Sequence, residues 1–172
     1  IKSLYNAFCE LNLDTSGVGL SREEGYRYFC TPIGAEVFGW DNGIHYCFID
    51  GLGEIVFCVN PETCCDYYTY PVARNFNDFL SLLLAVRTTN TLQQVICWDK
   101  KTFENFMNDP TEIEADSDPE IACTHKAIRE KLGISPIENP FEYIKELQKN
   151  FPYQMIRFTD EFYDFTGIER IE

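Results

Sequence analysis

The chain has 172 residues, of which 45% are hydrophobic and 15% aromatic, so it can bury one sizeable core and is not a mainly disordered chain. Its formal net charge of −14 argues against direct contact with a nucleic-acid backbone, which requires clustered Lys and Arg. The sequence has no apolar run of the roughly 18–20 residues that a membrane-spanning helix needs.

Two short helices are predicted at the start of the chain. Leu4, Phe8 and Leu11 recur at helical spacing and indicate the first helix. Ser21 and Glu24 match a capping box and indicate the second.

A hairpin at the centre of an antiparallel sheet is predicted next, from the segment GIHYCFIDGLGEIVFCVNP, residues 43–61. A strand over residues 35–40 and an Asp-Asn-Gly turn precede it. Residues 44–49 and 54–59 both alternate between two largely apolar faces. We therefore expect two neighbouring strands that are covered on both sides.

The hairpin also holds residues that catalytic sites use. Side chains at i and i+2 of a strand lie roughly 6.6 Å apart, whereas a nucleophile and its base need about 2.6–3.2 Å. His45 and Cys47 therefore make a poor dyad, and we expect His45 to be structural. Asp41, Asp50 and Glu54 could gather at one end of the hairpin, although 28 acidic residues make solvated turns the simpler interpretation.

A further strand and a strongly apolar helix are predicted after the hairpin. The strand covers residues 67–72, and Pro71 favours an edge or a strand end. The helix near residues 76–87 has Asn75 as its cap and a wide apolar face that should pack on the sheet. Another helix is expected to open at Trp98-Asp99.

The last third of the single domain, about residues 109–172, is predicted to be a helical extension joined by an acidic loop. Residues 109–120, DPTEIEADSDPE, carry six acids and no base, which favours a solvated linker or mobile loop. A helix begins at Pro119 and another at Asn139-Pro140. A late strand is expected near residues 153–158, followed by a final short helix.

The eight Cys residues are interpreted as free thiols in a cytoplasmic protein, because several lie in apolar segments and no C-x-x-C motif occurs. No secretory signal pattern opens the sequence. The adjacent pair Cys64–Cys65 is either sensitive to redox or metals or a chance neighbour. With two His and no nucleotide-binding or hydrolase motif, we expect no cofactor and no metal site.

The order of short helices, a meander ending in GIHYCFIDGLGEIVFCVNP, then YPVARNFNDFLSLLLA and ICWDKKTFENFM resembles the SUKH superfamily over roughly residues 20–108. That superfamily includes bacterial toxin-immunity proteins and regulators of cell-wall synthesis. The resemblance implies an α+β fold, with a mostly antiparallel sheet and helices packed against it. It also implies a function in protein binding, and it carries no catalytic signature.

Three functions follow as hypotheses. The first is a non-enzymatic immunity-type protein that binds and neutralises a toxin, for example a nuclease. The others are a regulator of cell-wall or glucan synthesis that acts through protein contacts, and a small hydrolase that uses carboxylates or a Cys. A basic protein partner would suit the acidic chain. The candidate contact residues are Trp40, Asp41, Asp50, Glu54, Asp66 and Tyr68.

Overall fold

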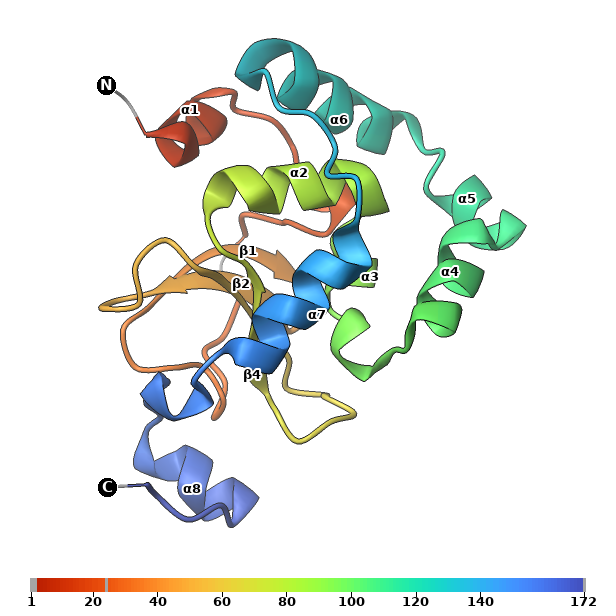
Figure 1. Cartoon of the computed structure of the whole chain (residues 1–172). Coiled ribbons are helices and arrows are strands. Elements are labelled where there is room, and N and C mark those ends of the chain that lie inside the picture. The colour runs from red at the N-terminus through yellow and green to blue at the C-terminus, as the bar shows by residue number, and fades with distance from the viewer. Residues whose placement is uncertain (1–2, 24, 172) are drawn as a thin grey trace.

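A four-stranded antiparallel sheet in the order β1-β2-β3-β4 forms the centre of an α+β fold (Figure 1). The structure is a computed structural model that describes residues 3–23 and 25–171. Its strands are β1 (Ala35–Asp41), β2 (Ile44–Ile49), β3 (Val56–Val59) and β4 (Thr69–Ala73). Its α-helices are α1 (Leu4–Glu10), α2 (Phe76–Val86), α3 (Thr89–Leu92), α4 (Lys100–Asn108), α5 (Pro110–Ala115), α6 (Pro119–Leu132), α7 (Pro140–Asn150) and α8 (Asp160–Thr166). Three short 3₁₀ turns, η1 (Ser16–Val18), η2 (Val95–Cys97) and η3 (Tyr153–Met155), complete the described elements.

The central hairpin predicted from the sequence is confirmed as β2 and β3. His45 pairs with Val59 and Cys47 with Phe57. The second strand is shorter than predicted, because Glu54 lies in the turn and pairing begins after it. β4 forms the edge of the sheet, which is the position that Pro71 favours.

One face of the sheet packs against α2, as its apolar pattern predicts. The Asn75 side chain caps α2 by accepting a hydrogen bond from the backbone N–H of Asp78 at 2.8 Å. Phe79, Leu80 and Leu83 are fully buried in the same cluster as the sheet residues Tyr46, Val56, Tyr70 and Val72. Figure 1 shows α1 and α6 beyond α2, on the side away from the sheet.

The opposite face of the sheet is covered by the C-terminal segment (residues 151–171). Phe151, Ile156 and Phe162 of this segment are buried with Cys47 and Phe57 of the hairpin. α7 lies along β4 and leads the chain around the sheet edge, where the Gln148 side chain donates to the carbonyl of Pro71 at 3.1 Å. Both faces of the hairpin are therefore covered, as its two apolar faces require.

The predicted second helix is wrong. Ser21 instead forms an isolated bridge with Trp40, in which each backbone N–H donates to the other residue's carbonyl at 2.8 Å. The backbone groups that a helix at Ser21 would use are thus taken by β1. Glu24, the other half of the predicted capping box, lies outside the described residues.

The predicted late strand is also wrong. Residues 153–155 form η3, and residues 156–158 are irregular. Their apolar side chains pack onto the covered sheet face. The Arg157 carbonyl does accept one backbone hydrogen bond, from Ile33 at 2.8 Å.

The acidic segment 109–120 contains a helix where the sequence predicts a linker or mobile loop. Asp109 caps α5 by accepting from the backbone N–H of Thr111 at 2.8 Å, and Pro110 occupies the first turn. Asp116 pairs with Arg87 at 2.7 Å and fixes the segment to the end of α2. The segment is solvated as predicted, since α5 buries none of its residues.

Candidate functional site

The predicted contact residues divide between the two ends of the sheet. A row of paired residues, Trp40–His45–Val59–Thr69, crosses all four strands. The β1–β2 turn and the β3–β4 loop (residues 60–68) therefore leave the same end, which brings Trp40, Asp41, Asp66 and Tyr68 to one side.

Asp50 and Glu54 lie in the β2–β3 turn, at the other end of β2. A six-residue strand spans roughly 20 Å. Asp41, Asp50 and Glu54 therefore do not gather at one end of the hairpin, and Asp50 and Glu54 are exposed in their turn, as the simpler interpretation of solvated turns expects. Consecutive turns of a meander alternate between opposite ends of the sheet.

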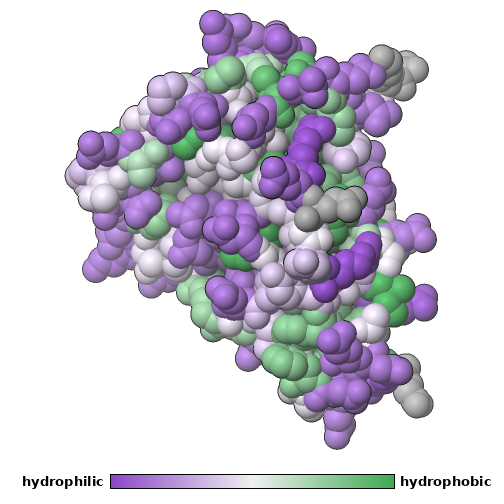
Figure 2. Space-filling model, turned by 180° about the vertical axis from the view of Figure 1, so that it is seen from behind, coloured by the Kyte–Doolittle hydropathy of each residue, from purple (hydrophilic) through white to green (hydrophobic). Residues whose placement is uncertain are grey.

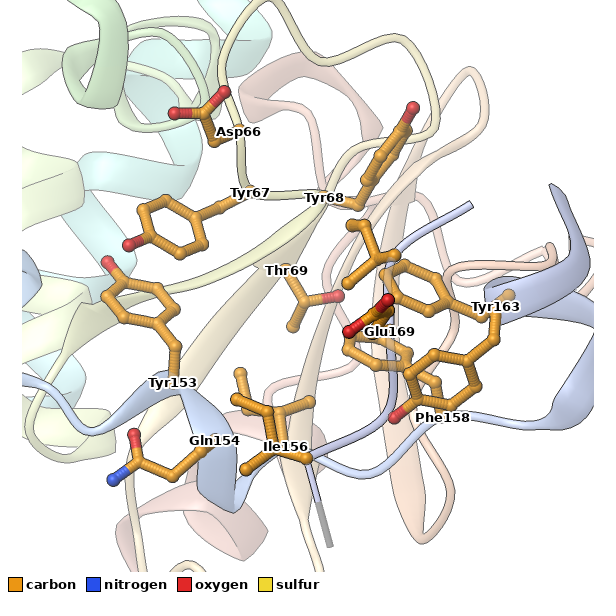
Figure 3. Close-up of a pocket in the computed structure, with 13 residues that line it drawn as sticks. Asp66, Tyr67, Tyr68, Thr69, Tyr153, Gln154, Ile156, Phe158, Tyr163 and Glu169 are labelled. Carbon is orange, nitrogen blue, oxygen red and sulfur yellow. The ribbon is translucent and has the colours of Figure 1, made fainter. Parts of the chain in front are cut away.

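An aromatic cavity of about 310 Å³ lies beside the β3–β4 loop (Figure 3). It forms between that loop, the start of β4 and the C-terminal segment. Two predicted contact residues, Asp66 and Tyr68, belong to its wall. The aromatic cavity is lined by Asp66, Tyr67, Tyr68, Thr69, Tyr153, Gln154, Ile156, Phe158, Phe162, Tyr163, Ile168, Glu169 and Ile171.

The β3–β4 loop is shaped by its own polar groups. The Asn60 N–H donates to the carbonyl of Tyr68 at 2.7 Å, and the Thr63 hydroxyl donates to the carbonyl of Tyr67 at 2.8 Å. A disulfide between Cys64 and Cys97 ties the loop to η2. These contacts orient Tyr67 and Tyr68 towards the C-terminal segment.

The disulfide corrects the expectation that all eight Cys are free thiols. Cys97 does not share the buried apolar setting of Cys47 and Cys58, because it is exposed at the end of η2 and reaches the exposed Cys64. The other six Cys are free, and Cys65 is not bonded to its neighbour.

Aromatic contacts join the loop to the opposite wall. The rings of Tyr67 and Tyr153 are stacked with centroids 3.8 Å apart, and Figure 3 shows them facing each other. The Tyr153 hydroxyl donates to the carbonyl of Gln148 at 3.0 Å, and burial raises the pKa of this phenol. Phe158 and Phe162 form a second stack with centroids 3.9 Å apart.

The charged groups in the wall of the aromatic cavity are acidic. Among the described lining residues these are Asp66 and Glu169, and both are exposed. Beside the cavity, Arg170 pairs with Asp160 and places its guanidinium 4.7 Å from the ring centroid of Tyr163. The cavity thus offers aromatic faces and carboxylates to a ligand.

A second hollow of about 250 Å³ lies at the same end of the sheet, next to Asp41. Burial raises the pKa of the Asp41 carboxyl, and a hydrogen bond from Gln93 partly offsets the effect. Glu62 is a second acidic residue among the described ones in this wall. Both hollows at this end therefore carry acidic groups.

The structure places His45 in a structural role, as the strand geometry predicts. It is fully buried, and its ring nitrogens lie 2.9 Å from the Gly43 carbonyl and 3.0 Å from the Thr31 hydroxyl. Because the Gly43 carbonyl can only accept, Nδ1 carries the proton of the neutral ring, and Nε2 accepts from the Thr31 hydroxyl, which itself accepts from the backbone N–H of Tyr28 at 2.9 Å. The Trp40 ring packs on His45 with centroids 4.4 Å apart, which leaves this Trp half-buried.

Sequence reasoning missed the C-terminal wall of the aromatic cavity. Tyr153, Phe158, Phe162, Tyr163 and Glu169 meet the β3–β4 loop through a return of the chain around β4, which local patterns do not reveal. The density of aromatics in FPYQMIRFTDEFYDF was the available signal.

Other features bear on site chemistry. The described residues contain no group of three or more His, Cys, Asp or Glu that could hold a metal ion. No helix within residues 3–23 and 25–171 has the length and apolar character to cross a bilayer. Comparison with protein-family models, with curated proteins and with solved structures finds no match to the chain.

Proposed function

We propose that the chain is a non-enzymatic protein-binding module of the immunity type, which binds and neutralises a basic toxin. The observation that carries this proposal is the shared end of the sheet, where two hollows combine aromatic and acidic residues. Aromatic side chains anchor interfaces, and acids accelerate the approach of a basic partner. The resemblance to the SUKH superfamily points to the same function.

The surface composition supports this choice. The net charge of −14 gives long-range attraction to a basic protein and repulsion from nucleic acid. Figure 2 shows mostly hydrophilic side chains on the face seen from behind, with hydrophobic ones gathering in its lower part. That part holds the C-terminal end of the chain, whose exposed apolar residues include Phe165 at 68% exposure.

The buried thiols favour binding over Cys-dependent chemistry. Cys47 and Cys58 are fully buried, and burial raises the pKa of both thiols, that of Cys58 to about 12. A protonated thiol is a poor nucleophile. His45, the nearest imidazole along the strand, already uses both ring nitrogens in structural hydrogen bonds.

Toxin neutralisation can be tested in cells. The tagged protein is used to capture partners from the source organism. Each captured protein is then expressed in cells, once alone and once together with this chain. We expect one basic partner that arrests growth when expressed alone and is tolerated on co-expression. A partner that synthesises cell wall or glucan, without toxicity, would replace the immunity proposal by the regulator hypothesis.

A further inference from the structure

We infer that the aromatic cavity is a receptor for one arginine side chain, presented by the basic partner. The inference rests on the proposed function for the source of that arginine. The ligand chemistry rests on the cavity itself, which combines tyrosine faces with the carboxylates of Asp66 and Glu169.

The size of the cavity suits a single side chain. About 310 Å³ lies at the lower limit of the roughly 300–1,000 Å³ found for small-molecule pockets. Tyr67, Tyr68, Tyr153 and Tyr163 provide phenol rings from two walls. These rings can cover the methylene stem of a long side chain while its polar end stays near the rim.

The charge of the cavity selects a cation. Asp66 and Glu169 are the charged residues among those described in the wall, and they come from opposite walls, the β3–β4 loop and the C-terminal tail. Figure 3 shows the Asp66 carboxylate at the loop and the Glu169 carboxylate near Tyr163. An anionic ligand would meet repulsion from both groups, whereas a cation would be attracted by both.

The chain already uses this chemistry next to the cavity. The guanidinium of Arg170 lies over the Tyr163 ring while it pairs with Asp160. Away from the cavity, Arg74 lies 4.6 Å from the ring centroid of Tyr143, a phenol that donates to Asp78 at 2.6 Å. In both places a guanidinium, a tyrosine ring and a carboxylate occur together, and the aromatic cavity supplies the ring and the carboxylate.

Arginine is favoured over lysine because its guanidinium is planar. A planar cation stacks on an aromatic face and donates several hydrogen bonds in a fixed fork, whereas an ammonium is a compact and strongly hydrated charge. The exposed ring of Tyr67 and the two separate carboxylates match the first pattern.

The inference can be tested without the partner. The whole protein is titrated with the blocked peptide Gly-Arg-Gly, with its neutral citrulline counterpart and with Gly-Lys-Gly, while the resonances of the tyrosine side chains are followed by NMR. We expect saturable shifts of the cavity tyrosines with the arginine peptide, and binding of the citrulline peptide at least about 5-fold weaker.

Variants locate the site. Asp66→Asn and Glu169→Gln should each weaken binding of the arginine peptide by about 2- to 5-fold. Asp50→Asn, a change at another exposed acid in the turn at the other end of the sheet, should leave it unchanged. Equal affinity for arginine and citrulline, shifts elsewhere, or no saturation at about 10 mM peptide would overturn the inference. If a variant misfolds, the comparison of the arginine and citrulline peptides on the wild-type protein still tests the inference.

The two proposals fail separately. Neutralisation of a basic toxin that is insensitive to the cavity variants, with no peptide binding, would reject the arginine receptor and keep the function. Selective peptide binding without any neutralised partner would reject the immunity function and keep the receptor chemistry.

Discussion

Tyr67 and Tyr153 stack face to face with ring centroids 3.8 Å apart and an interplanar angle of 16°. One ring belongs to the β3–β4 loop and the other to η3, at the start of the segment that covers the second sheet face. This pair joins the two walls of the aromatic cavity and couples two segments that are distant in sequence.

The stack should contribute a measurable coupling energy. In a double-mutant cycle with Tyr67→Leu and Tyr153→Leu, we expect a coupling of about 0.5–1.5 kcal/mol in the free energy of unfolding, as for other aromatic pairs. Tyr67→Leu combined with Tyr143→Leu serves as the matched control, because Tyr143 contacts Arg74 and Asp78 instead. A coupling below about 0.3 kcal/mol for the first pair would show that the stack does not form.

The packing of α2 should dominate stability. Leu80→Ala and Leu83→Ala should each lower the free energy of unfolding by about 2–5 kcal/mol, since both side chains are fully buried between α2 and its neighbours. Ile113→Ala, on the exposed surface of α5, should change it by about 0.5 kcal/mol or less. Denaturant unfolding measures all three, and equal effects at the three positions would contradict the fold.

Acid should weaken the fold through its two imidazoles. Burial lowers the pKa of His45 and His125, so below the ordinary value of about 6.5 the unfolded chain binds protons that the folded chain does not. Stability should therefore fall as the pH drops below about 6.5 and level off below the folded pKa.

A variant isolates the contribution of His125. This residue of α6 is half-buried, and its Nε2 is 2.7 Å from the Arg87 carbonyl, to which it donates. His125→Gln keeps a donor there but cannot titrate. Between about pH 7.5 and pH 5 it should lose less unfolding free energy than the wild type. An identical pH dependence in urea titrations would contradict the lowered pKa.

The thiols should divide into six free groups and one disulfide. Alkylation in denaturant without reductant should label six Cys, and reduction beforehand should label all eight. Loss of the bond in Cys64→Ser should cost roughly 2–4 kcal/mol of unfolding free energy. The bond joins two residues 33 positions apart, and without it the unfolded chain gains conformational entropy. Eight labelled Cys in freshly prepared, unreduced protein would restore the original prediction of free thiols.

Local sequence patterns were sufficient to predict elements that depend on interactions between residues close in sequence. Alternation over residues 44–49 predicted β2, Asn75 predicted the start of α2, and Asp99 marked the start of α4, which it caps at 2.8 Å. The same reasoning failed at Ser21, whose capping signal was overridden by backbone pairing with Trp40.

The site depends on long-range contacts, and for that reason it was found only in part. Asp66 and Tyr68 stood out as polar and aromatic residues after a strand, but their partners lie more than 80 residues later in the chain. Asp50 and Glu54 were grouped with Asp41 because sequence proximity hides the alternation of turns between sheet ends. The disulfide could not be predicted for a similar reason, since Cys64 and Cys97 are far apart in the sequence and belong to no common short motif.

The rate at which the purified partner associates, measured over a range of ionic strength, tests the central claim most directly. We expect the rate to fall steeply from about 0.01 M to about 0.15 M salt, because the acidic chain attracts a basic partner. At low salt, Asp66→Lys should slow association strongly, whereas Asp50→Lys, at the far end of the sheet, should slow it much less. An association rate that changes neither with salt nor with Asp66→Lys would contradict an acidic docking site at the end of the sheet that carries the aromatic cavity.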